Sequence, residues 1–337
     1  MSVTIRDVAR RAGVSISTVS RVLNASSPVS EEKQRRVTEA AETLGYHPNP
    51  AALSLLNKRT GALGVLLPFM SGEFFSELLG GLDEAAQKAG QSLVVSSSHS
   101  RTDDFGRAAH ILHKRVDGLL VMAPELGAAG ASQLAASDAP VVFLNTDAGP
   151  DIAADSINFD NYGGAKEATE HLIGLGHRRL VFVEGPASAW DAEERARGFQ
   201  AAVGEAGLGG DARRVAGGYT REAGYAAAQE ILRLDPSPTA VVAANDYAAL
   251  GIMSALHEAG VRVPDELSVC GFDGLPSGAF ALPPLTTVHV PVRELGARAV
   301  ELLLERITAM EAAPAFRRDV VPVEHLPRAS TAAPRTA

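Results

Sequence analysis

The chain has 337 residues, of which 46% are hydrophobic and 21% charged, and a formal net charge of −9. This composition is typical of a soluble globular protein of two or three domains and excludes a disordered or fibrous one. No apolar run reaches the roughly 18 residues of a membrane helix, and the charged start MSVTIRDVARRAG excludes a signal peptide. We therefore expect a cytoplasmic protein with no membrane partner, whose single cysteine, Cys270, is inert core.

Charge is distributed unevenly along the chain. Residues 1–60 contain nine lysines and arginines and five aspartates and glutamates, a net charge of +4, whereas the remainder carries −13. A basic first domain on an acidic body suits a protein whose head meets phosphate while its body is repelled from it. The pattern indicates nucleic acid as a partner of the first domain.

Three short helices are predicted in the first 45 residues. The first begins at Thr4, with Asp7 at the spacing of a capping box, and runs to about residue 11. Gly13 supplies the positive φ of a sharp turn, and Ser15 is a good N-cap for a second helix over 16–23. A third helix is expected over 30–44, ended by Gly45. This arrangement is a helix-turn-helix.

The second helix has the composition of a recognition helix. Its outward face holds Ile16, Ser17, Thr18, Ser20 and Arg21. Short side chains at the start of the helix allow its N-terminus to approach DNA closely, and a long bidentate donor one turn later reaches a guanine edge. We expect this helix to read the major groove.

A dense motif spans these helices. The run TIRDVARRAGVSISTVSRVLN from Thr4 to Asn24, continued by GYHPNP from Gly45, resembles the lactose/galactose repressor family of bacterial transcriptional regulators. The resemblance implies that Ile16 and Ser17 choose the operator sequence and that Arg21 contacts a base. It also implies backbone or phosphate contacts from the residues Thr4, Ser15, Thr18, Ser20 and Asn24.

The next segment, NPAALSLLN over residues 49–57, resembles the hinge helix that the family forms on operator DNA. The resemblance implies contacts from Asn49, Ala52 and Leu55, with Leu55 wedging into a base step from the minor groove. Such a wedge requires a dimer on a roughly palindromic operator. Leu53 stands where relatives commonly have an arginine, which puts one of the family's contacts in question, and the alternative is a plain apolar linker.

From Gly61 onward, short apolar strands alternate with amphipathic helices such as 74–89 and 222–232. The expected strands are 63–67, 92–95, 118–122, 141–144, 180–183, 240–243 and 267–271. This alternation indicates an α/β fold, with parallel sheets covered by helices on both faces and ligands bound at the carboxyl ends of the strands.

Motifs in the body extend the family resemblance, among them LGHRR at 175–179, RARGF at 195–199, AND at 244–246 and PLTT at 284–287. The resemblance implies the two-lobed fold of periplasmic sugar-binding proteins, with crossovers near Asp160, Val290 and Val321. We expect a head at 1–48, a hinge at 49–59, an effector domain at 60–330 and a tail at 331–337 that lacks a tetramer helix. The N-lobe would comprise about 60–160 and 291–320, and the C-lobe about 161–290 and 321–330.

A polyol requires flat apolar faces for its ring and planar polar groups for its hydroxyls. Chemistry and resemblance together nominate the effector residues Phe74, Phe75, Trp190, Asp191, Arg195, Tyr219, Asn245 and Asp273. Trp190 lies in a strand-to-helix segment, Tyr219 ends a strand, and Asn245 and Asp273 each follow one. Asp160 and Asn161 are expected to brace a crossover.

The sequence has no catalytic motif, phosphate loop or metal-spaced Cys/His cluster, so we predict no enzyme, metal or cofactor. The predicted function is a homodimeric repressor that binds operator DNA and senses a small molecule, most simply a sugar. Two alternatives stay open. One is the same architecture sensing a purine corepressor, although Ala189 stands where purine sensors supply an arginine, and the other is a soluble sugar-binding protein.

Overall fold

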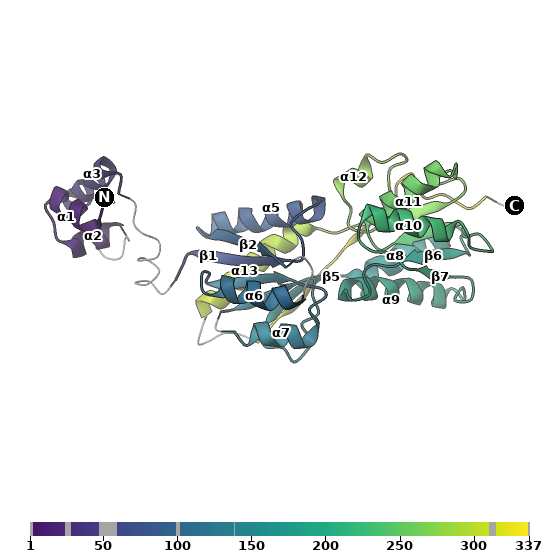
Figure 1. Ribbon diagram of the computed structural model, residues 1–337, viewed down its shortest axis with the longest axis horizontal. Helices are drawn as coiled ribbons and strands as arrows, with labels where there is room; N and C mark the ends of the chain where they lie inside the picture. The colour runs from purple at the N-terminus through teal and green to yellow at the C-terminus, as the bar shows by residue number, and fades with distance from the viewer. Residues whose placement is uncertain are drawn as a thin grey trace. The chain divides into compact units, whose positions relative to one another are not determined.

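The computed structural model describes residues 3–23, 28–46, 59–98, 102–137, 139–309 and 315–335, without the side chains of 102–105. The chain divides into two compact units, Met1–Gly61 and Ala62–Ala337, which are drawn in Figure 1. Within the described ranges, no helix is both long enough and apolar enough to cross a membrane.

The first unit contains the predicted three helices, α1 (Ile5–Ala12), α2 (Ile16–Leu23) and α3 (Glu31–Leu44). Val8, Val19 and Val37, one from each helix, are completely buried together. The Thr4 N–H and hydroxyl both donate to the Asp7 carboxylate, at 3.0 and 2.6 Å, which confirms the capping box. The helix-turn-helix therefore forms around one apolar centre.

The turn after α1 is held from a distance. Gly13 has φ +63°, as the turn requires, and the Arg36 guanidinium on α3 donates to the carbonyls of Ala12 and Gly13. These carbonyls lie at the end of a helix, where they lack helical partners. Arg36 thus fixes the angle between α1 and α2.

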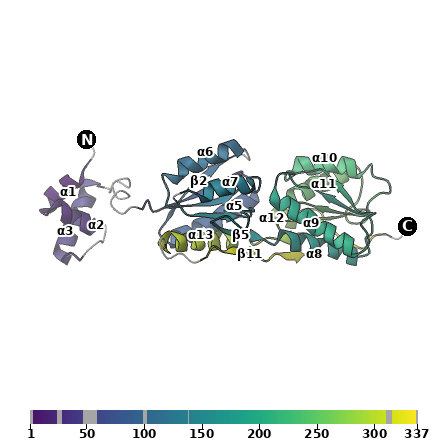
Figure 2. The same ribbon diagram turned by 90° about the horizontal axis from the view of Figure 1, so that it is seen from below.

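The second unit consists of two α/β lobes. The N-lobe has a six-stranded parallel sheet in the order β11-β5-β4-β3-β1-β2. Its strands are β1 (Ala62–Leu67), β2 (Ser92–Ser97), β3 (Gly118–Met122), β4 (Val141–Leu144), β5 (Asp155–Phe159) and β11 (Arg318–Val321). Figure 2 shows its helices on both faces, α5 (Glu73–Lys88) and α13 (Val292–Ala309) on one and α6 (Thr102–His113) and α7 (Gly127–Ala135) on the other.

The C-lobe repeats this plan on a smaller scale. Its parallel sheet has the order β7-β6-β8-β9, from β6 (Leu180–Val183), β7 (Arg213–Val215), β8 (Ala240–Ala243) and β9 (Ser268–Cys270). α8 (Asn161–Gly174) and α9 (Trp190–Glu205) cover one face, and α10 (Arg221–Ile231) and α11 (Asp246–Glu258) the other. A one-turn helix, α12 (Pro276–Ala279), follows β9. Cys270 is completely buried in this sheet.

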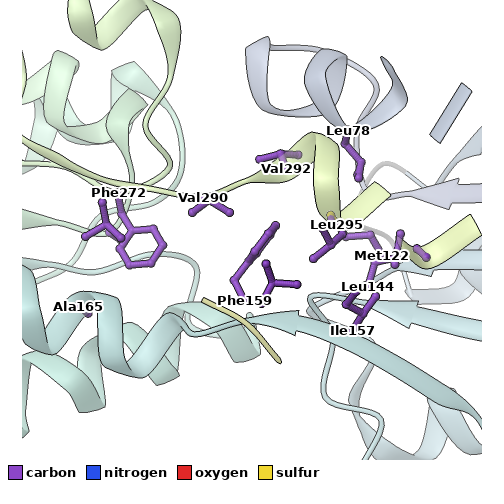
Figure 3. Packing of buried hydrophobic residues seen from close by; sticks show 14 of the residues in the cluster. Leu78, Met122, Leu144, Ile157, Phe159, Ala165, Phe272, Val290, Val292 and Leu295 are labelled. Atoms are coloured by element: carbon purple, nitrogen blue, oxygen red, sulfur yellow. The ribbon is translucent and has the colours of Figure 1, made fainter. Parts of the chain in front are cut away.

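The chain passes between the lobes three times. It does so from β5 to α8, from β10 (Thr287–His289) to α13, and from β11 to β12 (Glu324–Leu326), where β10 and β12 pair antiparallel. One apolar cluster runs through these crossovers, and Figure 3 shows Phe159 and Val290 between Leu295 and Phe272. The packing therefore continues from one lobe into the other.

Both α/β lobes and the head confirm the predicted fold class. The strands at 118–122, 141–144, 180–183 and 240–243 coincide with their predicted ranges, and β1, β2 and β9 lie within two residues of theirs. Five strands were not predicted, namely β5, β7, β10, β11 and β12. They are short or carry charged residues, as in RRV and RDVV at sheet edges, so their sequences lack a continuous apolar run.

The end of the chain is bound to the C-lobe. His177 Nε2 and the Ala332 carbonyl lie 2.8 Å apart, and the Ala332 N–H donates to Ser268 Oγ at 3.1 Å. Ser330 is completely buried. The described part of the predicted tail, residues 331–335, thus belongs to the packed body.

Candidate functional site

The outer face of α2 is open to a partner. Ile16 is 45% exposed, which is unusual for an isoleucine within a packed head, and Ser17 and Arg21 are exposed beside it. Within the described residues, the Arg21 guanidinium makes no hydrogen bond or ion pair. This face combines an apolar contact with a bidentate donor, the two kinds of group that read base edges.

Three hydroxyls gather at the N-terminus of α2. The Thr18 N–H donates to Ser15 Oγ at 3.2 Å, which makes Ser15 the N-cap, and Ser15 Oγ lies 2.8 Å from both the Ser17 and Thr18 hydroxyls. Unpaired N–H groups and the positive end of the helix dipole favour an anion such as phosphate at this position. Thr4 is exposed at the start of α1, and Ser20 is half-buried.

Part of the predicted DNA site falls outside the described residues. This concerns Asn24 after α2 and the hinge residues Asn49, Ala52 and Leu55. Leu53, which stands where relatives commonly have an arginine, also lies outside the described residues.

Seven of the eight predicted effector residues line one cavity of about 490 Å³: Phe74, Phe75, Asp191, Arg195, Tyr219, Asn245 and Asp273. They come from the start of α5 in the N-lobe, from α9, and from the segments that follow β7, β8 and β9. These positions meet at the carboxyl ends of parallel strands, where α/β folds bind ligands.

Trp190 does not line this cavity. It is the first residue of α9 and is half-buried, and its backbone N–H donates to the Pro124 carbonyl at 3.2 Å. The sequence places it beside Asp191 and Arg195, but the helical turn directs one residue inward and its neighbour elsewhere.

Tyr219 was predicted to end a strand, and this is wrong. β7 ends at Val215, and Tyr219 lies in the loop before α10. The intervening Gly217 approaches the Glu184 carbonyl so closely that a Cβ would lie 2.6 Å from its oxygen. After β7 the backbone thus passes close to Glu184 instead of continuing as a strand. The Tyr219 ring nevertheless lines the cavity.

Arg195 is the centre of the cavity floor. It is 3% exposed; its Nε donates to Asn161 Oδ1 at 2.9 Å and its Nη1 to the Ala244 carbonyl at 2.6 Å. Its guanidinium also lies 3.4 Å from an Asp273 oxygen and 3.8 Å from an Asp191 oxygen. One buried cation thus orients two carboxylates.

Asn145, at the end of β4 in the N-lobe, completes the floor and was missed by the sequence analysis. Its Nδ2 donates to Asp191 at 3.0 Å, and its Oδ1 accepts from Asn161 Nδ2 at 2.8 Å. Asn161 therefore braces the crossover, as expected, while Asn145 links the two lobes directly. The rule that selected Asn245, a polar residue just after a strand, applies equally to Asn145.

Two buried carboxyl groups, Asp273 in the floor and the neighbouring Asp246, have raised pKa values. Burial raises the pKa of Asp273 to about 7, because Arg195 offsets only part of the cost of the charged form. Burial, and then the neighbouring Asp273 carboxylate, raise the pKa of Asp246 to about 8. Asp273 also has φ +119°, a strained conformation for a non-glycine residue and one typical of functional sites.

The opposite wall of the cavity is aromatic. Phe69 and Phe74 each pack edge-on against Phe75, with ring centroids 6.5 and 5.3 Å apart. Tyr219 of the C-lobe also lines the cavity, and burial raises the pKa of its hydroxyl well above the usual value. This wall presents flat apolar faces to a ligand.

The lobes are also bonded at the cavity mouth. The Glu73 N–H donates to the Tyr247 hydroxyl at 2.7 Å, and the Ser277 N–H donates to Glu73 Oε2 at 2.8 Å. Tyr247 and Ser277 belong to the C-lobe, so the start of α5 holds both sides of the cleft. Among the described residues, no cluster of three or more side chains suits a metal ion.

Two family models match this chain. Residues 4–49 match the family of bacterial regulatory proteins, lacI family, and residues 169–331 match a periplasmic binding protein-like domain. The HTH-type transcriptional repressor PurR of Photobacterium profundum is 36% identical over 310 residues, which cover 90% of this chain and 92% of that protein.

Solved structures extend the similarity to three dimensions. The lac repressor dimer bound to operator and the anti-inducer ONPF has a TM-score of 0.90 at 32% identity, covering 99% of this chain and all of that one. A complex of the transcriptional regulator CelR with cellobiose has a TM-score of 0.72 at 28% identity, covering 97% of this chain and 99% of that one. The chain therefore belongs to the lacI family and is a DNA-binding transcriptional repressor with an effector domain rather than an enzyme.

Proposed function

We propose that the effector bound between the lobes is a carbohydrate. The observation that carries this proposal is the composition of the cavity, in which a buried Arg195 with Asp191 and Asp273 faces a wall of phenylalanine rings. Hydroxyl groups donate and accept hydrogen bonds, so they satisfy carboxylates and a guanidinium at once, while the ring faces cover aromatic side chains.

Two further points support a sugar. The similar regulator CelR is solved with cellobiose. Ala189, at the position where purine sensors supply an arginine, is buried at the N-cap of α9 and is not part of the cavity lining. The second candidate is a purine, because the curated relatives carry the name PurR.

A thermal-shift screen of sugars and nucleobases on the full chain tests this proposal. A ligand present at about 100 times its Kd adds roughly 2.7 kcal/mol to the stability of the unit that binds it. The chain's one tryptophan, Trp190, reports on that unit. We expect sugars to raise the melting midpoint; a midpoint raised by a purine and by no sugar would show the assignment to be wrong.

For the head, we propose that α2 lies in the major groove of the operator. Ile16, Ser17 and Arg21 would contact base edges, and the hydroxyls around Ser15, with Thr4, Thr18, Ser20 and Asn24, would bind the backbone. Arg21→Ala should weaken operator binding by about 5–150-fold in a gel shift, which corresponds to the loss of one bidentate base contact. Arg10→Ala is the control, because its exposed side chain pairs with Asp7 on α1.

We also propose a hinge over 49–59, in which Asn49, Ala52 and Leu55 contact the minor groove of DNA held by a dimer. Leu55→Ala should weaken specific binding much more than binding to an unrelated duplex, since a wedge acts only where the site is kinked. Equal losses on both duplexes would exclude the wedge.

A further inference from the structure

Three histidines lie where the end of the chain meets the C-lobe. His177, just after α8, donates from Nε2 to the Ala332 carbonyl at 2.8 Å. His171, in the last turn of α8, has its Nε2 3.1 Å from the Thr331 hydroxyl. The third, His325, belongs to β12, the strand that enters the C-lobe at the last crossover. All three side chains thus connect the last part of the chain to α8 and the turn after it.

His171 and His325 are packed against each other. Their ring centroids are 4.5 Å apart, and the rings are tilted by 48°. A Cβ on Gly164, two turns before His171 on the same face of α8, would lie 2.6 Å from a side-chain atom of Val323. Val323 is two residues before His325 and shares its face, and β12 is held in register by pairing with β10. The packing of the strand on the helix therefore holds the two rings together.

Among the described residues, this pair of rings has no acidic partner. His325 Nε2 is buried and makes no hydrogen bond there. Glu324, its neighbour on the strand, points to the other face, where it pairs with His289 of β10. The other charged side chains of the surrounding elements are exposed or bonded elsewhere: Glu167 at the surface, Lys166 with Glu170, Arg178 with the Ile173 carbonyl, Arg328 with the Leu285 carbonyl and Arg335 with Asp265. A proton added to either ring would therefore meet a second imidazole instead of a carboxylate.

These surroundings keep the histidines neutral in the folded protein. Burial lowers the pKa of His171 and of His177. Burial, and then repulsion from His171, lower the pKa of His325 from the ordinary 6.5 to about 4. A histidine with a lowered folded-state pKa stabilises the fold above its ordinary pKa, and this contribution is lost as pH falls toward the lowered value. The contribution of His325 is therefore lost between about pH 6.5 and 4.

We propose that His171 and His325 form an acid-sensitive clasp, which holds β12 and the residues after it on the C-lobe while both rings are neutral and releases them when either is protonated. The clasp acts on the connection between the lobes, because β12 follows the crossover from β11 and pairs with β10, which precedes the crossover to α13. Opening it loosens two of the three crossovers. This inference does not depend on the identity of the effector.

Hydrogen exchange of the full chain tests the clasp, read by mass spectrometry at pH 7.5 and 5.0 and corrected for the pH dependence of unprotected amides. The reporter is the segment 322–335, in which the Arg328 and Ala332 N–H groups donate to Thr286 Oγ1 and Ser268 Oγ. Its protection should fall about tenfold at pH 5.0. A pKa of about 4 instead of 6.5 sets roughly 30-fold for one histidine, and solvent around the partly exposed ring reduces this factor. β6, inside the C-lobe sheet, should keep its protection, because the release is local.

Substitutions identify the rings responsible. His325→Leu removes one titrating ring and should abolish the fall, and His171→Gln, which keeps an amide beside Thr331, should reduce it. His257→Gln is the matched control, because His257 is exposed on α11, and it should behave as the wild type.

Two results would overturn the clasp at once: no fall in the wild type, or a fall of the same size in His325→Leu. An equal loss of protection in β6 would also overturn it, because acid would then open the whole lobe and not its end. If His325→Leu does not fold, His171→Gln and the comparison of the two segments in the wild type decide.

Discussion

Replacing Arg195 by methionine removes the buried guanidinium at the centre of the cavity floor and keeps a long side chain in its place. The variant loses the bonds to Asn161 and Ala244 and leaves Asp191 and Asp273 without the guanidinium that faces both. All three ionisable groups are less than a tenth exposed. The effector should no longer bind, and the body should unfold more easily.

Removing one partner of a buried ion pair costs about 3–5 kcal/mol. The cost should depend on pH, because Asp273 can be protonated. Its pKa in the folded wild type is about 7, above its ordinary value of 3.8, and loss of Arg195 raises it further. A raised folded-state pKa gives stability that is present at acid pH and lost as pH rises through that pKa. The deficit of Arg195→Met should therefore be largest at pH 8 and smaller at pH 5.

Urea denaturation followed by Trp190 fluorescence measures this directly. Arg197→Met is a matched control on the same helix, since the Arg197 side chain is 55% exposed and its ion pair with Glu194 contributes about 1 kcal/mol or less. Adding Asp273→Asn to Arg195→Met should restore part of the stability, because one of the unbalanced charges is then gone. If Arg195→Met lowers the free energy of unfolding by less than about 1 kcal/mol at pH 8, or if adding Asp273→Asn restores none of it, Arg195 does not stabilise the fold by balancing the charges of Asp191 and Asp273.

Three further changes test other parts of the molecule. Gly13→Ala should weaken operator binding in a gel shift, because φ +63° disfavours alanine and its Cβ would lie 2.4 Å from Arg36 Nη2. The pKa of Asp246 is raised to about 8 in the folded protein, so the wild type loses stability as pH rises from 5 to 8, whereas asparagine does not titrate. The free energy of unfolding of Asp246→Asn minus that of the wild type, measured by urea denaturation, should therefore increase between pH 5 and pH 8. Tyr247→Phe removes the bond to the Glu73 N–H and should weaken effector binding by up to about tenfold in calorimetry; an unchanged Kd would mean that the bond is not used.

Sequence patterns predicted the elements that are determined by residues close together in the sequence. The capping box at Thr4, the turn at Gly13 and the buried strands such as 118–122 follow from spacing, backbone freedom and apolar runs. Edge strands such as β11 were missed because an edge needs no continuous apolar sequence. Local rules therefore find the strands that contain an apolar run, including the edge strands β2 and β9, and miss strands without one, including the interior strand β5.

The site residues divide in the same way. A polar residue after a buried strand predicted Asn245 and Asp273, and the same rule would have found Asn145. Arg36 and Tyr247 have no such signal, because their partners lie far away in sequence on Gly13 and Glu73. Such contacts exist only once the helices have packed.

A ligand can control DNA binding only if its free energy of binding differs between two arrangements of the lobes. The cleft meets this requirement in its construction, since Asn145 of the N-lobe bonds Asp191 of the C-lobe, and the start of α5 bonds Tyr247. A ligand that bonds Asp273 while packing on Phe74 and Phe75 would add to these contacts in one arrangement only.

The route from the cleft toward the head is short along the chain. α5 carries the aromatic wall and follows β1, which begins at Ala62 where the first compact unit ends. Because coupling between two binding sites is reciprocal, operator DNA must alter the affinity of the effector by the same factor by which the effector alters that of DNA. The contacts across the cleft thus set the size of the response, and the sign follows from whether the operator favours the arrangement in which those contacts are made.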